Sequence, residues 1–113
     1  MSDLVLILTT VPADERADRI ARTLVDERLA ACVNVQTPMT SFYRWKGVVE
    51  QDGERQLVIK TTRDRTNQVW TRLRELHPYE LPEWIVVPVL EASPEYLEWV
   101  RAETAAPDIS GTR

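Results

Sequence analysis

The chain has 113 residues, a formal net charge of −4, one histidine and one cysteine. This length is typical of a single domain with a true hydrophobic core. Acidic and basic residues are interspersed, which argues against nucleic acid or an anionic membrane as the main partner, since both require a basic patch. The lone cysteine, Cys32, excludes an intrachain disulfide and a cysteine-based zinc site.

No targeting or membrane segment is predicted. Residues 1–3 lack the basic region of a signal peptide, and the longest apolar runs are much too short to span a bilayer. We therefore expect a cytoplasmic protein with no membrane partner. A reducing compartment suits the free thiol of Cys32, which is interpreted as a buried structural residue between two apolar neighbours.

The first half of the chain predicts a strand, a helix and a long hairpin. Residues 4–8 form a continuous apolar run that indicates a buried strand. Pro12 fits the first turn of a helix that reaches about Arg28. Its apolar face would consist of Ala17, Ile20, Ala21, Leu24 and Val25.

The hairpin is predicted from β-branched and aromatic residues around a turn at Lys46-Gly47. Its first strand covers residues 31–35 and 41–45, with a bend at Thr37-Pro38. Its return strand begins at residue 48, is interrupted at 51–53, and resumes at 56–61.

The second half predicts a helix over residues 64–76, a strand over 84–89 and a short third helix. Pro88 indicates an edge position or a bulge in that strand. Ser93 caps the third helix, and Pro94 occupies its first position. We expect one domain over residues 1–104 and a flexible tail over 105–113.

This order of elements predicts an α+β fold, a ferredoxin-like βαββαβ sandwich with an extra C-terminal helix. Right-handed crossovers place the two main helices on one face of the antiparallel sheet. The runs at residues 4–8, 57–59 and 85–89 are apolar at successive positions, so these strands are hydrophobic on both faces. The third helix is expected to be too short to cover the second face.

An uncovered apolar face predicts self-association. At about 25 cal/mol per Å², leaving several such side chains in water forgoes on the order of 10 kcal/mol. A patch of this kind normally marks an interface, and cyclic symmetry closes the assembly. The alternative is a doubly wound monomer, which needs more helices than the sequence contains.

The segment from Leu76 to Glu83, LHPYELPE, is the strongest candidate for a functional site. Two prolines stiffen a connection that carries an imidazole, a phenol and two carboxylates. His77 is either a metal or ligand contact or a plain helix stop whose charged form favours the helix dipole. Glu80 and Glu83 are solvated turn residues unless a cleft encloses them, in which case one carboxyl pKa rises.

The aromatic residues of the hairpin also allow two interpretations. Phe42, Tyr43, Trp45 and Trp84 form either a wall for a planar ligand or packing at a subunit interface, and the composition favours packing. No phosphate-binding glycine loop and no local Ser-His-Asp motif is present. The chain is therefore expected not to be an enzyme.

Six short stretches in this order identify a resemblance. They are Thr9-Thr10-Val11-Pro12, Leu29-Ala30-Ala31-Cys32-Val33-Asn34, Tyr43-Arg44-Trp45-Lys46-Gly47, Ile59-Lys60-Thr61-Thr62, the segment 77–83, and Tyr96-Leu97-Glu98-Trp99. With these stretches the chain resembles the CutA divalent-ion tolerance family from about Leu4 to Val100. The resemblance implies a compact homotrimer similar to the PII signalling proteins, which agrees with the two-faced strands.

The resemblance also implies a response to divalent metal ions, with a cation such as copper as a ligand. In copper-binding relatives a cysteine occupies the position of Thr9, and paired histidines occupy those of Leu76 and His77. Here His77 alone is kept, so the implied metal site combines His77 with Glu80, Glu83 or a neighbouring subunit.

Two functions are thus expected from the sequence, and an enzyme that uses Glu80 or Glu83 as a base is a third alternative for which no substrate is suggested. The first is a non-enzymatic homotrimer in divalent-ion tolerance or small-ligand sensing at clefts between subunits. Its contact residues would be Thr9, Thr10, His77, Tyr79, Glu80 and Glu83. The alternative is a structural or adaptor trimer that binds a protein partner or a small ligand and uses no metal.

Overall fold

The computed structural model describes residues 2–105, so the expected tail lies outside the described residues except for Ala105. The elements are β1 (Leu4–Pro12), α1 (Arg16–Asp26), β2 (Cys32–Val35), β3 (Met39–Trp45), β4 (Val48–Thr62), a 3-10 helix η1 (Arg63–Arg65), α2 (Thr66–Leu76), β5 (Ile85–Pro88) and α3 (Pro94–Thr104). No helix of this described part is long and apolar enough to cross a membrane.

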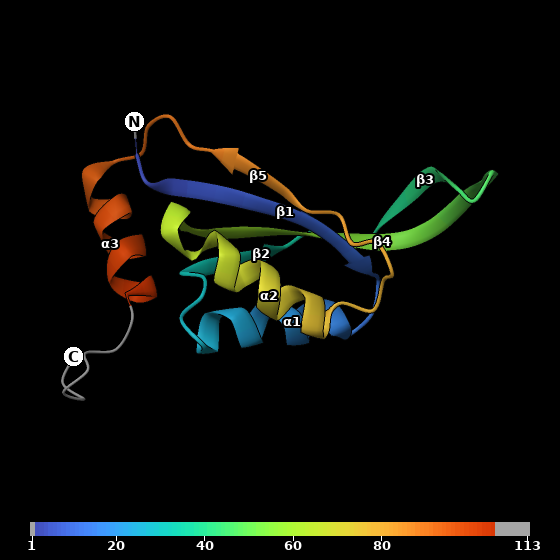
Figure 1. Ribbon diagram of the computed structural model, residues 1–113, viewed down its shortest axis with the longest axis horizontal. Helices are drawn as coiled ribbons and strands as arrows, with labels where there is room; N and C mark the ends of the chain where they lie inside the picture. Colours follow the sequence, from blue (N-terminus) through green and yellow to red (C-terminus); the bar gives the residue numbers. More distant parts are fainter. Residues whose placement is uncertain (1, 106–113) are drawn as a thin grey trace.

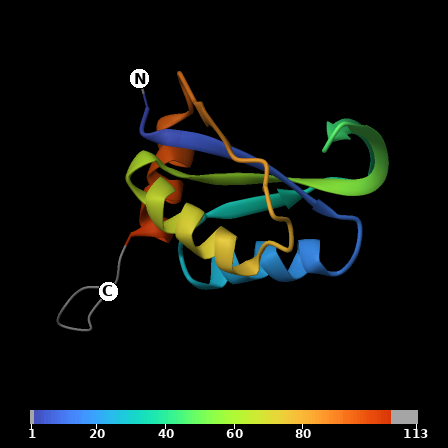
Figure 2. The same ribbon diagram turned by 45° about the vertical axis from the view of Figure 1, so that its right-hand side comes forward.

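The sheet is antiparallel and has the strand order β2-β4-β1-β5. β3 pairs with the first half of β4, and β2 pairs with its second half, so the bend predicted at Thr37-Pro38 is confirmed. α1 and α2 lie together on one side of the sheet, and the β3–β4 hairpin extends away from the end that carries α3 (Figures 1 and 2). The predicted ferredoxin-like α+β fold is confirmed.

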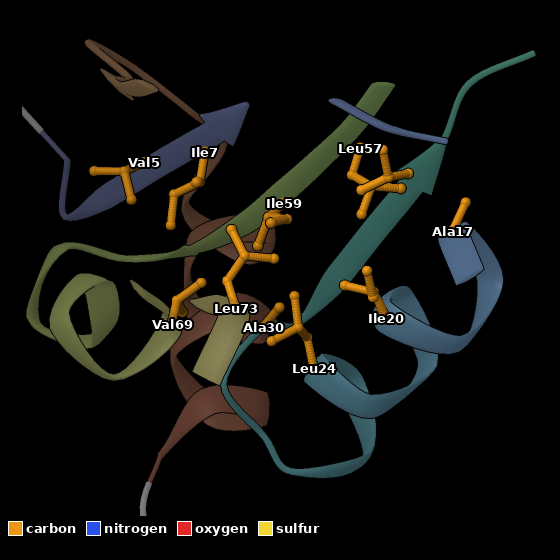
Figure 3. Packing of buried hydrophobic residues seen from close by; sticks show 11 residues of the cluster. Val5, Ile7, Ala17, Ile20, Leu24, Ala30, Leu57, Ile59, Val69 and Leu73 are labelled. Carbon is orange, nitrogen blue, oxygen red and sulfur yellow. The ribbon is translucent and has the colours of Figure 1, made fainter. Parts of the chain in front are cut away.

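The core lies between the sheet and the two helices α1 and α2 (Figure 3). Alternate residues of β1 point into it, and Ile7 faces Ile59 across the ladder with β4. Both side chains are fully buried, as are Ile20 and Leu24 of α1 and Val69 and Leu73 of α2. Val25 was predicted to join this face but is 41 % exposed.

The opposite face of the sheet is only partly covered. We call it the open face, made of Leu6, Leu8, Val58, Ile85 and Val87, which share one side through the β1–β4 and β1–β5 registers. All five are half-buried or exposed. α3 covers only the end of this face, where Val100 packs against Leu4 and Ala31.

The third helix is longer than predicted. α3 has 11 residues, as many as α1 and α2. Its start is as expected, because Ser93 accepts a hydrogen bond from the Tyr96 amide at 3.3 Å and Pro94 follows. Two arginines hold its end: Arg65 Nε donates to the Thr104 carbonyl at 2.7 Å, and Arg28 Nη2 donates to that of Ala102 at 2.8 Å.

Two local predictions are wrong. Pro12 ends β1 rather than starting α1. β5 pairs only with Val5–Leu8, so β1 has a free edge beyond Leu8, where a proline is tolerated. The interruption predicted at 51–53 is absent, because β3 pairs with this stretch and Gly53 lies opposite Thr40 in the ladder.

The hairpin makes the subunit elongated. The described chain measures 51 × 30 × 22 Å, and its radius of gyration is 15.3 Å. A compact chain of this length has a radius of gyration of about 13 Å. The far half of the hairpin thus leaves the main body and forms one wall of a cleft.

Candidate functional site

A cleft of about 870 Å³ lies between the β3–β4 hairpin and the loop at residues 77–83. We call it the hairpin cleft. It is lined by Thr10, Met39, Ser41, Tyr43, Arg44, Trp45, Glu54, Gln56, Pro78, Tyr79, Glu80, Leu81, Pro82 and Glu83. Strand alternation explains much of this set, because every second residue of β3 from Met39 to Trp45 shares one face.

His77 connects the end of α2 to this cleft. Its backbone is extended, since the following proline disfavours helical geometry, and the helix therefore ends there. Nε2 lies 2.8 Å from the carbonyl oxygen of Thr10, and Nδ1 accepts a hydrogen bond from the Tyr79 amide at 3.1 Å. A carbonyl only accepts, so the proton must be on Nε2 and the ring is the neutral Nε2–H tautomer.

The environment favours this neutral form. His77 is 8 % exposed, and its burial lowers the pKa of the imidazole. The Thr10 carbonyl and the charge of Glu54 oppose this shift, and Arg16 adds to it. The interpretation of His77 as a charged residue at a helix C-terminus is therefore wrong for this conformation.

Tyr79 extends the network to β4. Its hydroxyl donates to Glu54 Oε2 at 2.9 Å, and Glu54 is only 7 % exposed. Burial and this hydrogen bond raise the pKa of the Tyr79 hydroxyl. Across the cleft, the hydroxyl of Tyr43 donates to Asp52, which raises the pKa of Tyr43 to about 12. Both phenols are thus held as neutral donors.

The two glutamates of the loop have different surroundings. Glu83 is half-buried, and its pKa is raised by burial and by the charge of Glu54, while a hydrogen bond from Gln56 opposes the shift. Glu80 is exposed and lies 3.9 Å from Lys46 Nζ. The cleft therefore encloses Glu83 but leaves Glu80 at its rim.

Thr9 and Thr10 are neighbours in β1, and their side chains lie on opposite faces of the sheet. The side chain of Thr10 lies in the cleft, whereas Thr9 is fully buried on the helix side, and its hydroxyl has no hydrogen-bond partner within residues 2–105. Of the six predicted contact residues, the structure brings together Thr10, His77, Tyr79, Glu80 and Glu83 in one chain. Thr9 does not join them.

Glu54 was missed by the sequence analysis. It follows Gly53 in a stretch that reads as an interruption, yet the ladder places it beside Gln56 on the face that carries Thr10. No local pattern marks Glu54, because residues 54–56 are all polar and only the pairing with β1 shows which of them face the cleft. In the described part of the chain, no three His, Cys, Asp or Glu side chains are grouped so that they can hold a metal ion.

A sequence model of the CutA1 family, described as divalent ion tolerance protein, matches residues 5–103. The chain belongs to the CutA1 divalent ion tolerance family. The resemblance carried by its six short stretches is confirmed.

Several relatives in this family are similar over most of their length. The divalent-cation tolerance protein CutA of Thermus thermophilus is 47 % identical over 99 residues, which are 88 % of this chain and 96 % of that protein. That of Pectobacterium atrosepticum is 40 % identical and covers 90 % of this chain and 93 % of its own length. Protein CutA of Mus musculus is 43 % identical, but the match covers 58 % of its length.

Solved CutA structures have the same fold as this chain. The crystal structure of CutA from Xylella fastidiosa superposes with a TM-score of 0.88 at 48 % identity, over 91 % of this chain and 99 % of that one. CutA1 from Thermus thermophilus gives 0.87 at 45 % identity, over 90 % and 99 % of the two chains.

Proposed function

We propose that this chain acts as a non-catalytic homotrimer in divalent-cation tolerance, with the hairpin cleft as its ligand contact. The observation that carries the proposal is the open face of the sheet. Its five apolar side chains lie beside a projecting hairpin, and α3 covers only one end of this surface. A soluble subunit with such a face normally covers it with another subunit.

The energetics favour assembly. Burying a Val, Leu or Ile side chain completely contributes about 1.5–3 kcal/mol, so covering the remaining area of several such residues stabilises an oligomer. Besides the open face, the elongated hairpin gives each subunit a second surface that can contact a neighbouring subunit. Cyclic symmetry lets identical copies cover each other without leaving an unpaired face.

The non-catalytic role is supported by the hydrogen bonds of the cleft. Both nitrogens of His77 are bonded within the chain, and the phenols of Tyr43 and Tyr79 are held by carboxylates. A general base needs a free lone pair facing the substrate, and in this conformation the imidazole presents none. These groups position the walls of a binding site.

Light scattering on the purified protein at micromolar concentration tests the assembly. The chain has a mass of 13.0 kDa, so a trimer has three times that mass. A folded monomer at this concentration contradicts the proposal.

Calorimetric titration with Cu(II) and Zn(II) tests the metal contact. The only lone pair of the neutral ring is on Nδ1, so a metal ion at His77 must displace the Tyr79 amide. If His77 is a ligand, His77→Gln loses the heat of binding that the wild type shows. Equal titrations, or no heat from either protein, reject His77 as a metal ligand.

One observation favours the adaptor function as an alternative. Phe42 and Val49 lie on the same face of the hairpin and are 67 % and 61 % exposed. Exposed apolar side chains on a projecting hairpin are typical of a protein contact. A pull-down partner that is lost with Phe42→Ser but kept with His77→Gln supports this alternative over a ligand function.

A further inference from the structure

The hairpin cleft brings two enclosed carboxylates together with three aromatic rings. Glu54 comes from β4 and is almost fully buried, and Glu83 comes from the loop and is half-buried. Tyr43 and Trp45 of β3 line the same cleft, as does Tyr79. Negative charge and π faces therefore meet in one concave site.

In the part of the chain that the structure describes, neither Glu54 nor Glu83 has an ion-pair partner within 4 Å. Arg44 is the one basic residue among those that line the cleft. Glu54 accepts a hydrogen bond from a neutral donor, the hydroxyl of Tyr79, and the neutral Gln56 lines the cleft together with Glu83. Two partly desolvated carboxylates without an ion-pair partner attract a cation, because a charge-assisted hydrogen bond is about twice as strong as a neutral one.

The rim of the cleft already contains such an arrangement. Lys46 Nζ lies 5.6 Å from the centroid of the Trp45 ring and 3.9 Å from Glu80 Oε2. An ammonium group is thus placed between a carboxylate and an aromatic face, as cation–π geometry favours. Deeper in the cleft, Glu54 and Glu83 offer the same elements without a lysine.

The shape favours an organic cation over a bare metal ion. The two carboxylates have no third acidic, histidine or cysteine side chain grouped with them in the described chain, and a divalent ion prefers more ligands than two. The volume of about 870 Å³ lies within the range of about 300–1,000 Å³ that is typical of small-molecule sites. Most of this space faces rings and aliphatic side chains.

The geometry points to a primary ammonium compound with an apolar body as the ligand of the hairpin cleft. Its ammonium group donates to Glu54 and Glu83, and its body lies along Tyr43 and Trp45. This assignment rests on the proposed function, in which the cleft stays open to a small ligand in the assembly. It requires no covalent step and no metal ion.

Isothermal titration calorimetry with phenethylammonium tests the assignment on the full chain. Its uncharged counterpart, 2-phenylethanol, has the same ring and differs in the head group. We expect saturable binding of phenethylammonium at one site per subunit and binding of the alcohol that is weaker by about tenfold or more, since each charge-assisted hydrogen bond contributes about 1.5–3 kcal/mol.

Three variants locate the site. Glu83→Gln removes one charge from a half-buried position, and Glu54→Gln keeps an acceptor for the Tyr79 hydroxyl. Each is expected to weaken phenethylammonium binding by about tenfold or more. Glu80→Gln is the matched control at the rim and is expected to bind like the wild type. Because Glu83→Gln alone decides the test, a folding defect in Glu54→Gln does not affect the outcome.

Three results overturn the assignment: equal affinity for the amine and the alcohol, wild-type affinity in Glu83→Gln, or no saturable heat with the amine. Heat with Zn(II) or Cu(II) that is lost in Glu83→Gln, together with no heat from phenethylammonium, also overturns it in favour of a metal site. The mass from light scattering is independent of these titrations. A correct trimer without amine binding refutes this inference and leaves the proposed assembly in place.

Discussion

The hydroxyl of Tyr79 donates a hydrogen bond to Oε2 of Glu54 at 2.9 Å and thereby joins the loop after α2 to the middle of β4. The amide of the same tyrosine donates to His77 Nδ1, and His77 Nε2–H donates to the Thr10 carbonyl of β1. One loop is thus attached to two neighbouring strands through three consecutive hydrogen bonds. This network fixes the wall of the hairpin cleft.

Replacing Tyr79 by phenylalanine should destabilise the fold. The ring is kept, but the buried carboxylate of Glu54 loses the donor to Oε2, and an unsatisfied buried acceptor of this kind costs about 1–3 kcal/mol. Urea unfolding measures the difference in free energy from the wild type.

Tyr43→Phe is the matched control for this experiment. It also removes a phenol that donates to a carboxylate, but the Tyr43–Asp52 pair is exposed. Water replaces the lost hydrogen bond there, so little change in stability is expected. Equal losses in the two variants contradict a special role of the Tyr79–Glu54 bond.

The pKa of His77 predicts a pH dependence of stability. Burial lowers the pKa in the folded chain below its ordinary value of 6.5, so the unfolded chain binds more protons between the two values. The contribution of the neutral ring is therefore complete above pH 6.5 and is lost as the pH falls from 6.5 through the folded pKa. Protonation also removes the acceptor for the Tyr79 amide.

Unfolding midpoints in urea between pH 5 and 8 test this pH dependence. At each pH, the free energy of unfolding of His77→Gln is subtracted from that of the wild type. This difference reports the imidazole alone, because Glu83 and the other carboxyl groups titrate in both proteins. The pKa of Glu83 is raised, so its own contribution has the opposite sign and is lost as the pH rises from 4.5 through its folded value. A difference that does not depend on pH contradicts the buried neutral ring.

The sequence predicted most helices and strands correctly, but it did not predict which residues of a strand point to which side of the sheet. The helix stop at His77 and the cap at Ser93 follow from local chemistry, because proline and serine act within a few residues. By contrast, residues 4–8 are apolar at every position, so the run contains no alternation that tells which side of β1 faces the helices.

The same lack of alternation explains why the sequence predicted both Thr9 and Thr10 as contact residues of the cleft and missed Glu54. Neighbouring residues of a strand point to opposite faces, so only one of Thr9 and Thr10 can reach the cleft. Glu54 enters the site through pairing with β1, a contact between segments more than forty residues apart that no local pattern reports. The 77–83 loop was predictable because its functional groups are consecutive in the chain.

The buried position of Thr9 predicts a stabilising substitution. Its hydroxyl has no partner among the described residues, and Thr9→Val replaces it with a methyl group of similar shape. Removing an unpaired buried hydroxyl should raise the free energy of unfolding by about 1 kcal/mol.

Thr61→Val is the control for Thr9→Val and is expected to destabilise the fold. Thr61 is also fully buried in the sheet, but its hydroxyl donates to the Leu29 carbonyl at 2.7 Å. The variant should lose about 1 kcal/mol or more because that carbonyl is left without this donor. Thermal or urea unfolding of both variants measures the difference, and a destabilised Thr9→Val shows that its hydroxyl is hydrogen-bonded in solution.

A charge at the centre of the open face should break the assembly. Leu8 lies between Val58 of β4 and Ile85 of β5, so Leu8→Glu places a carboxylate in the middle of the proposed subunit interface. Desolvating an unpaired charge costs more than the interface gains from the neighbouring side chains. Because Leu8 does not face the helices, the subunit core keeps its packing.

Light scattering combined with circular dichroism measures this outcome. We expect Leu8→Glu to have the mass of a monomer with the secondary structure retained. Val25→Glu is the matched control, since Val25 is a partly exposed apolar residue on α1, away from the open face. If Leu8→Glu keeps the wild-type mass, or if Val25→Glu also dissociates, the sheet face is not the contact that holds the copies together.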